Sequence, residues 1–255
     1  MSYLQAFVIA LTQGVTELFP ISSLGHSVLI PAWIGGNWQT LVTQSSQANS
    51  ESSFYLAFIV ALHCATALAL LWYFLVDWFR IIGGFFRSVR SSLRERRIVV
   101  DDKDQRLAWM IIVATIPVGL FGVALEHTFR TLVAKPVAAS VFLFINGLVL
   151  FAGERFVRRQ RGRVQEAPTH DAVPVVEGAV RRSGRNRGEI QAARAADARI
   201  AGLHFSEVIY IGLLQVSALL AGISRDGVTM VGGLWRGLDR EDAARFAFLL
   251  ATPPI

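Results

Sequence analysis

Residues 13–26 read QGVTELFPISSLGH, a polar stretch that interrupts an apolar segment near the start of the chain. The stretch carries a carboxylate, two hydroxyls and an imidazole: Glu17, Ser22, Ser23 and His26. Pro20 and Gly25 disfavour a continuous helix, because proline lacks a backbone donor and glycine is a poor helix former. Ionisable groups are costly in lipid unless they face protein or water, so their presence at this depth indicates a functional site.

A second stretch, residues 215–229, reads QVSALLAGISRDGVT and repeats the pattern of a polar turn inside an apolar run. When the two stretches are aligned, four pairs are identical: Gln13 with Gln215, Ile21 with Ile223, Ser22 with Ser224, and Gly25 with Gly227. Paired broken helices in corresponding places of two halves are typical of an internal repeat with a site near the middle of the membrane. We therefore expect the two turns to face each other and to form one site.

The composition indicates an integral membrane protein. Of the 255 residues, 53% are hydrophobic and 17% are charged, and the mean hydropathy is +0.46. Soluble domains carry about 25% charged residues. A net charge of +6 would suit nucleic-acid binding, but the basic residues fall in loops between apolar spans, as the positive-inside rule predicts. We therefore expect a membrane as the partner, and no nucleic acid.

Three apolar runs reach the length of about 20 residues that crosses a bilayer: 54–76, 107–125 and 137–153. Residues 3–19 and 203–223 are interrupted runs that lead into the two polar turns, so we expect a re-entrant hairpin at each. The apolar run at 245–255 stops early, and we expect that closing C-terminal helices are missing after it. The predicted fold is an all-α polytopic membrane protein in which residues 1–255 form a single integral membrane domain.

The distribution of Lys and Arg predicts the orientation in the membrane. The basic segments 77–106 and 155–200 are separated by two spans, so they share one side, which we expect to be the cytoplasm. Residues 36–53 contain no Lys or Arg and lie one span away. We therefore expect these residues, and the mouth of the first polar turn, on the outer face. Residues 155–200, rich in Arg and scattered with Pro and Gly, are predicted to be a flexible basic cytoplasmic loop.

Arg225 is the strongest candidate for binding an anion. Its guanidinium stays charged and matches phosphate oxygens with two parallel donors. It precedes a helix expected from Val228 onward, whose N-terminal amides would favour an anion. Two hydroxyl donors lie nearby: Ser224 and Thr229. The simpler interpretations are that Arg225 forms a salt bridge with Asp226 or Glu17, and that the serines of both turns only cap helices.

Proton chemistry is expected from Glu17 and His26. Close to a phosphate, a carboxylate binds a hard divalent cation or acts as a base. A histidine either protonates a leaving group or attacks phosphorus itself, and a hydroxyl beside a base, such as that of Ser23, is another candidate nucleophile. The residues alone leave the choice between Ser23 and His26 open. His63, inside the 54–76 run, is expected to pack against a neighbouring helix.

The motifs GVTELFPISSLGH (14–26) and GISRDGVTMVGGLWRGLDREDAARFAFLLATPPI (222–255) resemble those of the undecaprenyl-diphosphate phosphatases of the bacitracin-resistance type. The resemblance covers nearly the whole chain and is weakest at 155–200. It implies a multi-pass hydrolase of the bacterial plasma membrane that converts undecaprenyl diphosphate to undecaprenyl phosphate and so recycles the lipid carrier for cell-wall synthesis. It also implies dependence on a divalent cation, Mg²⁺ or Ca²⁺, an inverted repeat with re-entrant helices, and a site that opens outward.

By motif position, the resemblance assigns catalytic roles to four residues: Glu17, Ser23, His26 and Arg225. It assigns the substrate phosphates to Ser22, Ser224, Arg225, Gly227 and Thr229, and a metal ion to Glu17, with Asp226 as a further candidate ligand. Three positions depart from the family pattern: Gln13 stands where a second glutamate is common, Ala221 where proline is usual, and Asp226 where serine is usual. A carboxylate beside Arg225 would either join the metal shell or repel the substrate phosphate.

Two alternatives come from other classes of protein. A lipid-phosphate transporter or flippase would use the same paired broken helices, with hydrolysis lost or reduced. A non-catalytic scaffold would use residues 155–200 to hold a cytoplasmic partner or anionic lipid. Either a monomer or a homodimer is compatible with the sequence.

Overall fold

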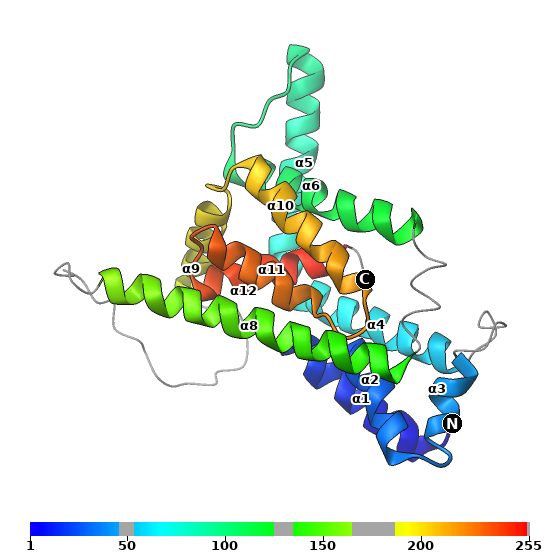
Figure 1. Cartoon of the computed structure of the whole chain (residues 1–255). Helices are drawn as coiled ribbons and strands as arrows, with labels where there is room; N and C mark the ends of the chain where they lie inside the picture. Colours follow the sequence, from blue (N-terminus) through cyan, green and yellow to red (C-terminus); the bar gives the residue numbers. More distant parts are fainter. Residues whose placement is uncertain (46–53, 125–134, 165–186, 254–255) are drawn as a thin grey trace.

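The computed structural model describes residues 1–45, 54–124, 135–164 and 187–253, and every regular element in these ranges is a helix (Figure 1). In chain order the elements are α1 (Tyr3–Leu18), α2 (Ser23–Ile34), α3 (Gln39–Ser45), α4 (Phe54–Tyr73), α5 (Leu75–Glu95), α6 (Lys103–Ala124), α8 (Pro136–Val164), α9 (Arg187–Ile200), α10 (Phe205–Val216), the 3₁₀ turn η2 (Ser217–Leu219), α11 (Arg225–Trp235) and α12 (Arg240–Ala251). The predicted all-α class is confirmed for the part of the chain that the structure describes.

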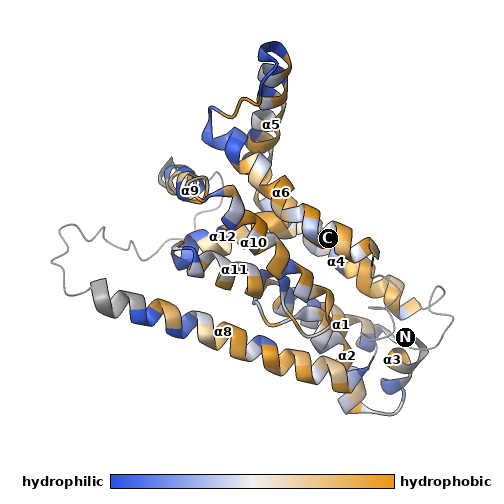
Figure 2. Cartoon of the chain, turned by 45° about the horizontal axis from the view of Figure 1, so that its top comes forward, coloured by the Kyte–Doolittle hydropathy of each residue, from blue (hydrophilic) through white to orange (hydrophobic). Residues whose placement is uncertain are grey.

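Three of these helices have the length and hydropathy to cross a membrane: α4, α6, and α8 over Pro136–Arg159. Helices α9 and α10 meet at 97° and count as a fourth span if they are taken together. Figure 2 shows long apolar stretches on α4, α6 and α8, and their large side chains, such as Trp72, Leu120 and Phe144, are exposed as lipid contact requires. A polytopic membrane protein is therefore confirmed, although α8 continues well beyond the predicted end at residue 153.

The first polar turn separates α1 from α2. Helix α1 ends at Leu18, two residues before Pro20, which cannot donate to a helical hydrogen bond. Ser22 then adopts a φ of +71°, and its hydroxyl accepts a hydrogen bond from the amide of Gly25 at 3.3 Å, which caps α2. The break is thus shorter than predicted, because the helix resumes at Ser23 and contains Gly25.

The second polar turn lies between η2 and α11. Gly222 has a φ of +113°, in the region that favours glycine, and the chain reverses there. Ser224 caps α11 by accepting from the amide of Gly227 at 3.2 Å. The predicted start of this helix at Val228 was wrong: α11 begins at Arg225 because the cap acts earlier in the sequence.

The two basic segments contain more helix than predicted. Much of the segment 77–106 belongs to α5, whose buried positions recur every three or four residues on one helical face: Asp77, Ile81, Gly84 and Ser88. At the ends of the segment 155–200, α8 continues to Val164 and α9 occupies Arg187–Ile200. The predicted flexible loop is therefore helical at both ends, and its centre, 165–186, lies outside the described residues.

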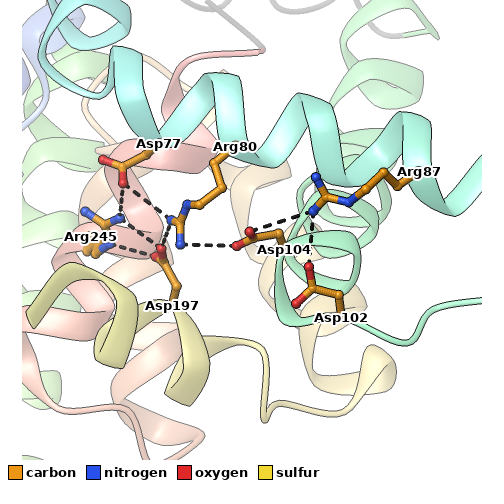
Figure 3. Close-up of polar contacts among 7 residues, drawn as sticks. All are labelled: Asp77, Arg80, Arg87, Asp102, Asp104, Asp197 and Arg245. Carbon is orange, nitrogen blue, oxygen red and sulfur yellow. Dashed lines mark hydrogen bonds and ion pairs between the residues drawn. The ribbon is translucent and has the colours of Figure 1, made fainter. Parts of the chain in front are cut away.

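A network of carboxylates and guanidinium groups fastens α9 to its neighbours (Figure 3). Asp197 of α9 accepts from Arg80 of α5 and from Nε of Arg245 of α12, the latter at 2.8 Å. Arg245 also lies 3.1 Å from Asp77, and Arg80 lies 3.1 Å from Asp104 of α6. Because Asp77 and Asp197 are buried and the other three side chains are partly buried, each charge needs its partners, and the network fixes the packing of four helices.

The largest apolar core joins α6, α10 and α12. Leu107 and Met110 of α6, Ile211 of α10 and Phe246 of α12 are fully buried in it. Gly212 allows α10 to lie close against α6, since a Cβ at this position would be 2.6 Å from the carbonyl oxygen of Ala114. This core supports α10 and α11, the two helices that hold the second polar turn.

Candidate functional site

The two polar turns are in direct contact, although they are 200 residues apart in the sequence. The amide of Gly222 donates to Oγ of Ser22 at 3.2 Å. A Cβ at Gly25 would lie 2.9 Å from Cα of Gly222, and one at Gly227 would lie 3.1 Å from the carbonyl oxygen of Pro20. The N-termini of α2 and α11 are therefore neighbours, which the sequence alignment of the turns had led us to expect.

Asn146 of α8 joins the two turns from the side. Its Nδ2 donates to the carbonyl oxygen of Pro20 at 3.3 Å, and its Oδ1 accepts from the amide of Ser224 at 2.9 Å. The side chain is 2% exposed. Sequence reasoning missed this residue, although an asparagine within the apolar run FLFINGLVLF was a signal of the same kind as the polar turns.

Oε2 of Glu17 is the centre of a polar cluster at the first turn. It accepts a hydrogen bond from the hydroxyl of Ser23 and another from Nε2 of Gln13, at 3.2 Å. Nε2 of His63 lies 3.8 Å from the same oxygen. Oε1 of Glu17 has no hydrogen-bond partner among the described residues, so it is available to a ligand.

His63 belongs to this cluster, which the sequence did not indicate. The prediction that it packs against a neighbouring helix describes its place, since α4 lies against α1, but the atom it meets is the candidate catalytic carboxylate. Its Nδ1 lies 2.9 Å from the carbonyl oxygen of Ile59, an arrangement that needs a proton on Nδ1 and turns Nε2 toward Glu17. The signal available in the sequence was a lone histidine inside a membrane span.

His26 lies in the first turn of α2, three residues after Ser23. Its Nδ1 lies 2.8 Å from the carbonyl oxygen of Ser22, and this bond leaves Nε2 without a protein partner in the described part of the chain. His26 and Glu17 are not in direct contact. Of the two candidate proton-transfer groups, Glu17 accepts from the Ser23 hydroxyl, and His26 lies one helical turn after Ser23 on α2.

The two neighbouring serines of the first turn have different hydrogen-bond partners. Ser22 caps α2 and also holds the second turn through Gly222, and Ser224 caps α11, so the capping interpretation applies to both residues. Ser23 instead directs its hydroxyl to Glu17. Of the hydroxyl groups considered from the sequence, Ser23 is the one paired with a base.

Arg225 opens α11 and forms no ion pair with any residue that the structure describes. Its Nη1 is buried and has no hydrogen-bond partner there. The alternative of a salt bridge to Asp226 or Glu17 is therefore not what the structure contains. A buried guanidinium nitrogen without a partner is costly, and a bound anion would satisfy it.

Asp226 and Thr229 complete the second turn. Asp226 is 5% exposed and lies next to Arg225 in the first turn of α11. Thr229 is buried one helical turn beyond Arg225. The predicted residues of both motifs thus lie around the contact between the two turns, which we call the junction. Hydrogen-bond donors are more common on its α11 side, and proton acceptors on its α1 side.

A cavity of about 890 Å³ lies between α1, α4 and α12. Its walls are mainly apolar and include Gly14, Leu18 and Phe248, but Glu241 and Arg245 of α12 line it as well. Gln13, which binds Glu17, lines the cavity as well, and its Oε1 is buried without a partner in the described residues. The cavity therefore reaches the polar cluster at Gln13.

Comparison with known proteins identifies clear relatives. The family described as "Bacitracin resistance protein BacA" matches residues 6–255. An undecaprenyl-diphosphatase 2 of Frankia alni is 53% identical over the whole chain, which covers 78% of that relative. Undecaprenyl-diphosphatases of Mycolicibacterium paratuberculosis and Mycobacterium avium are each 52% identical over the whole chain, which covers 75% of each.

Proposed function

The chain belongs to the bacitracin resistance protein BacA family, and from this membership we propose that it is a membrane enzyme that hydrolyses undecaprenyl diphosphate to undecaprenyl phosphate and phosphate. The resemblance carried by the two motifs is thereby confirmed, and the relatives named above give no support to a transporter. Recycling of the lipid carrier for cell-wall synthesis, and with it resistance to bacitracin, follows from this activity.

One observation carries the assignment of the site. Two helix N-termini adjoin each other, with the unpaired Arg225 on one side and the hydrogen-bonded pair of Ser23 and Glu17 on the other. Helix N-termini and a guanidinium favour an anion, whereas a carboxylate beside a hydroxyl provides a base and a nucleophile. A diphosphate placed between the turns would meet both sets of groups at once.

Ser23 is the nucleophile in this proposal. Its Oγ attacks the terminal phosphorus while its proton passes to Oε2 of Glu17, which already accepts that hydrogen bond. The bond between phosphorus and the bridging oxygen breaks, and the leaving undecaprenyl phosphate takes a proton from Nε2 of His26. Water then attacks the phosphoserine: its proton returns to His26, the proton held by Glu17 returns to Oγ of Ser23, and phosphate leaves.

Arg225 provides the charge that this phosphoryl transfer requires. Little covalent chemistry is needed from the protein, so catalysis depends on orienting the diphosphate and on neutralising charge on the phosphoryl oxygens. Thr229 and Gly227 lie on the same N-terminal part of α11. The hydroxyl of Thr229 and the first amides of α11 add hydrogen bonds to those oxygens.

A divalent cation fits the site together with substrate. Within the described ranges, no group of three or more His, Cys, Asp or Glu side chains is placed to hold a metal ion by itself. Mg²⁺, however, commonly binds one or two carboxylates plus substrate phosphates, and Glu17 has a free Oε1, with the carboxylate of Asp226 as the second candidate. When bound, the cation would lower the negative charge on the diphosphate.

The fold suits a lipid substrate. The cavity between α1, α4 and α12 reaches the polar cluster at Gln13 and is lined mainly by apolar side chains, so it supports binding of the isoprenoid tail. We assign the two interrupted segments, α1–α2 and α10–α11, to the re-entrant halves of an inverted repeat. The site is assigned to the outer face because the segments rich in Lys and Arg are placed on the opposite side.

Phosphate release by the purified full-length protein in detergent tests this function. We expect release from undecaprenyl diphosphate in the presence of Mg²⁺ or Ca²⁺, and its loss when a chelator is added. Undecaprenyl phosphate, which lacks the anhydride, is the control substrate and should release no phosphate. Binding of undecaprenyl diphosphate without hydrolysis under all metal conditions would contradict the proposal.

A further inference from the structure

We propose that Asn146 is a positioning residue that sets the spacing between the two polar turns, an inference that rests on the proposed function of the site they form. The residue lies on α8, outside both motifs, and its single amide group bonds to both turns. Among the described residues outside the two turns, no other side chain makes a hydrogen bond to each of them.

The two backbone groups that Asn146 binds have no helical partner. The carbonyl of Pro20 lies beyond the end of α1, and the amide of Ser224 belongs to the residue that caps α11. Groups at helix ends that are buried must be satisfied by side chains or water. An amide supplies one donor and one acceptor, which is the combination that this pair of groups requires.

Helix α8 also packs against α2 and, more closely, against the second turn and α11. A Cβ at Gly222 would lie 2.6 Å from the carbonyl oxygen of Ala139, and one at Gly227 would lie 3.2 Å from Cδ2 of Leu150. A Cβ at Gly153 would lie 2.7 Å from Cγ2 of Val231. Asn146 is therefore the polar contact in the middle of a close helix surface against which α2 and α11 pack.

The bonded positions explain why spacing matters for the reaction. Pro20 precedes the segment that carries Ser22 and Ser23, and Ser224 immediately precedes Arg225. Ser23, whose side chain attacks phosphorus, therefore lies three residues after one group that Asn146 binds. Arg225, which binds the phosphoryl oxygens, lies directly after the other. A displacement of about 1 Å between such groups can lower a rate on the order of 100-fold.

Asn146→Ala and Asn146→Asp test this inference in the full-length protein. For Asn146→Ala we expect kcat for phosphate release to fall by about 10- to 100-fold, while KM changes little. The thermal unfolding temperature should also fall, because two buried backbone groups lose their partner. In Asn146→Asp the protonated acid can donate to Pro20 and accept from Ser224 as the amide does. Its activity relative to the unsubstituted protein should therefore rise as the pH is lowered.

Ser88→Ala is the matched control. Ser88 is also fully buried, and it joins the loop after α5 to α6 by donating to the carbonyl of Val99 at 2.6 Å and accepting from Nε1 of Trp109 at 3.0 Å. Its loss should lower the unfolding temperature without lowering kcat of the folded protein. A kcat of Asn146→Ala within about twofold of the unsubstituted protein, or a flat activity ratio for Asn146→Asp across pH, would overturn the proposal.

Hydrogen exchange separates this inference from the proposed function. In Asn146→Ala, peptides that contain residues 19–26 and 217–229 should exchange faster, whether or not the protein releases phosphate. Unchanged exchange in both peptides would remove Asn146 as the bridge. If exchange rises while the unsubstituted protein hydrolyses nothing, the bridge stands and the proposed function falls.

Discussion

The hydroxyl of Ser23 donates a hydrogen bond to Oε2 of Glu17 across the break that separates α1 from α2. The two residues belong to different helices, and the turn between them, which contains Pro20, makes the contact possible. Ser22, next in sequence, faces the other way and binds the second turn. The break therefore serves to place a base beside a hydroxyl inside an apolar protein.

Replacing Ser23 with alanine should abolish turnover. Without the hydroxyl there is no group for Glu17 to activate, so we expect phosphate release to fall at least ~100-fold, with little change in thermal unfolding. Ser27→Ala is the control, because Ser27 lies one helical turn further along α2 and its buried hydroxyl has no partner in the described residues. Full turnover in Ser23→Ala would exclude Ser23 as the nucleophile and would favour direct attack by His26.

Arg225→Ala should weaken both binding and catalysis. The guanidinium is the only described group in the turns that carries a fixed positive charge, so its loss should raise KM and lower kcat for undecaprenyl diphosphate. Arg225→Lys should recover only part of the activity, because an ammonium group cannot bind two phosphate oxygens with a planar fork. Kinetics at several substrate concentrations measure both parameters.

The control for this change is Arg236→Ala at the end of the same helix. Arg236 stacks on the ring of Tyr210, with its guanidinium carbon 4.6 Å from the ring centroid, and takes no part in the turns. Its loss should leave KM unchanged. Equal effects of the two substitutions would indicate a general loss of α11 instead of a lost phosphate contact.

His63→Ala should lower kcat by about 10-fold, a modest loss compared with that of Ser23→Ala. His63 supports the Glu17 carboxylate at the oxygen that accepts from Ser23. His63→Gln keeps a polar side chain at this place and should retain more activity than His63→Ala. Cys64→Ala, at the exposed neighbouring position on α4, is the control and should change nothing. If both His63 variants match that control, the residue has only a packing role.

Much of this site was predictable because the signals that form it are local. Pro20 ends a helix wherever it occurs, and a serine before a run such as SRDG is a common cap, so both breaks were found from the sequence. The start of α11 was misplaced by three residues because the sequence does not show which of several polar residues acts as the cap. The contact between the turns followed from their similarity.

Residues that reach the site from other helices were not predictable in the same way. Asn146 and His63 stand alone in apolar spans, and only the packing of α8 and α4 brings them to the turns. The helix α5 was missed because charges recur along it, and its buried face becomes visible only when α6 is placed beside it. Tertiary packing, not local preference, decides these features.

Labelling of single cysteines tests the proposed orientation. In a Cys64→Ser background, Asn37→Cys, at an exposed position before α3, should react with a membrane-impermeant maleimide in intact cells. Arg90→Cys, at an exposed position on α5, should react only after the membrane is opened. The positive-inside rule gives this expectation, because the basic helix stays in the cytoplasm. Reaction of Arg90→Cys alone in intact cells would place the site on the opposite face.

Gly25→Ala tests whether the close contact of the two turns is required. The added methyl group would lie 2.9 Å from Cα of Gly222 and 3.2 Å from its nitrogen, and both are backbone atoms that can move only with the turn. The turns must therefore separate, which should weaken the bond from Gly222 to Ser22 and lower kcat by about 10-fold or more.

Gly119→Ala is the matched control, because nothing lies within 4 Å of a Cβ at that position on α6. Alanine is the better helix former, so this variant should unfold at the same or a higher temperature, with unchanged turnover. Normal kcat in Gly25→Ala would show that catalysis tolerates separated turns and would refute a site shared between them.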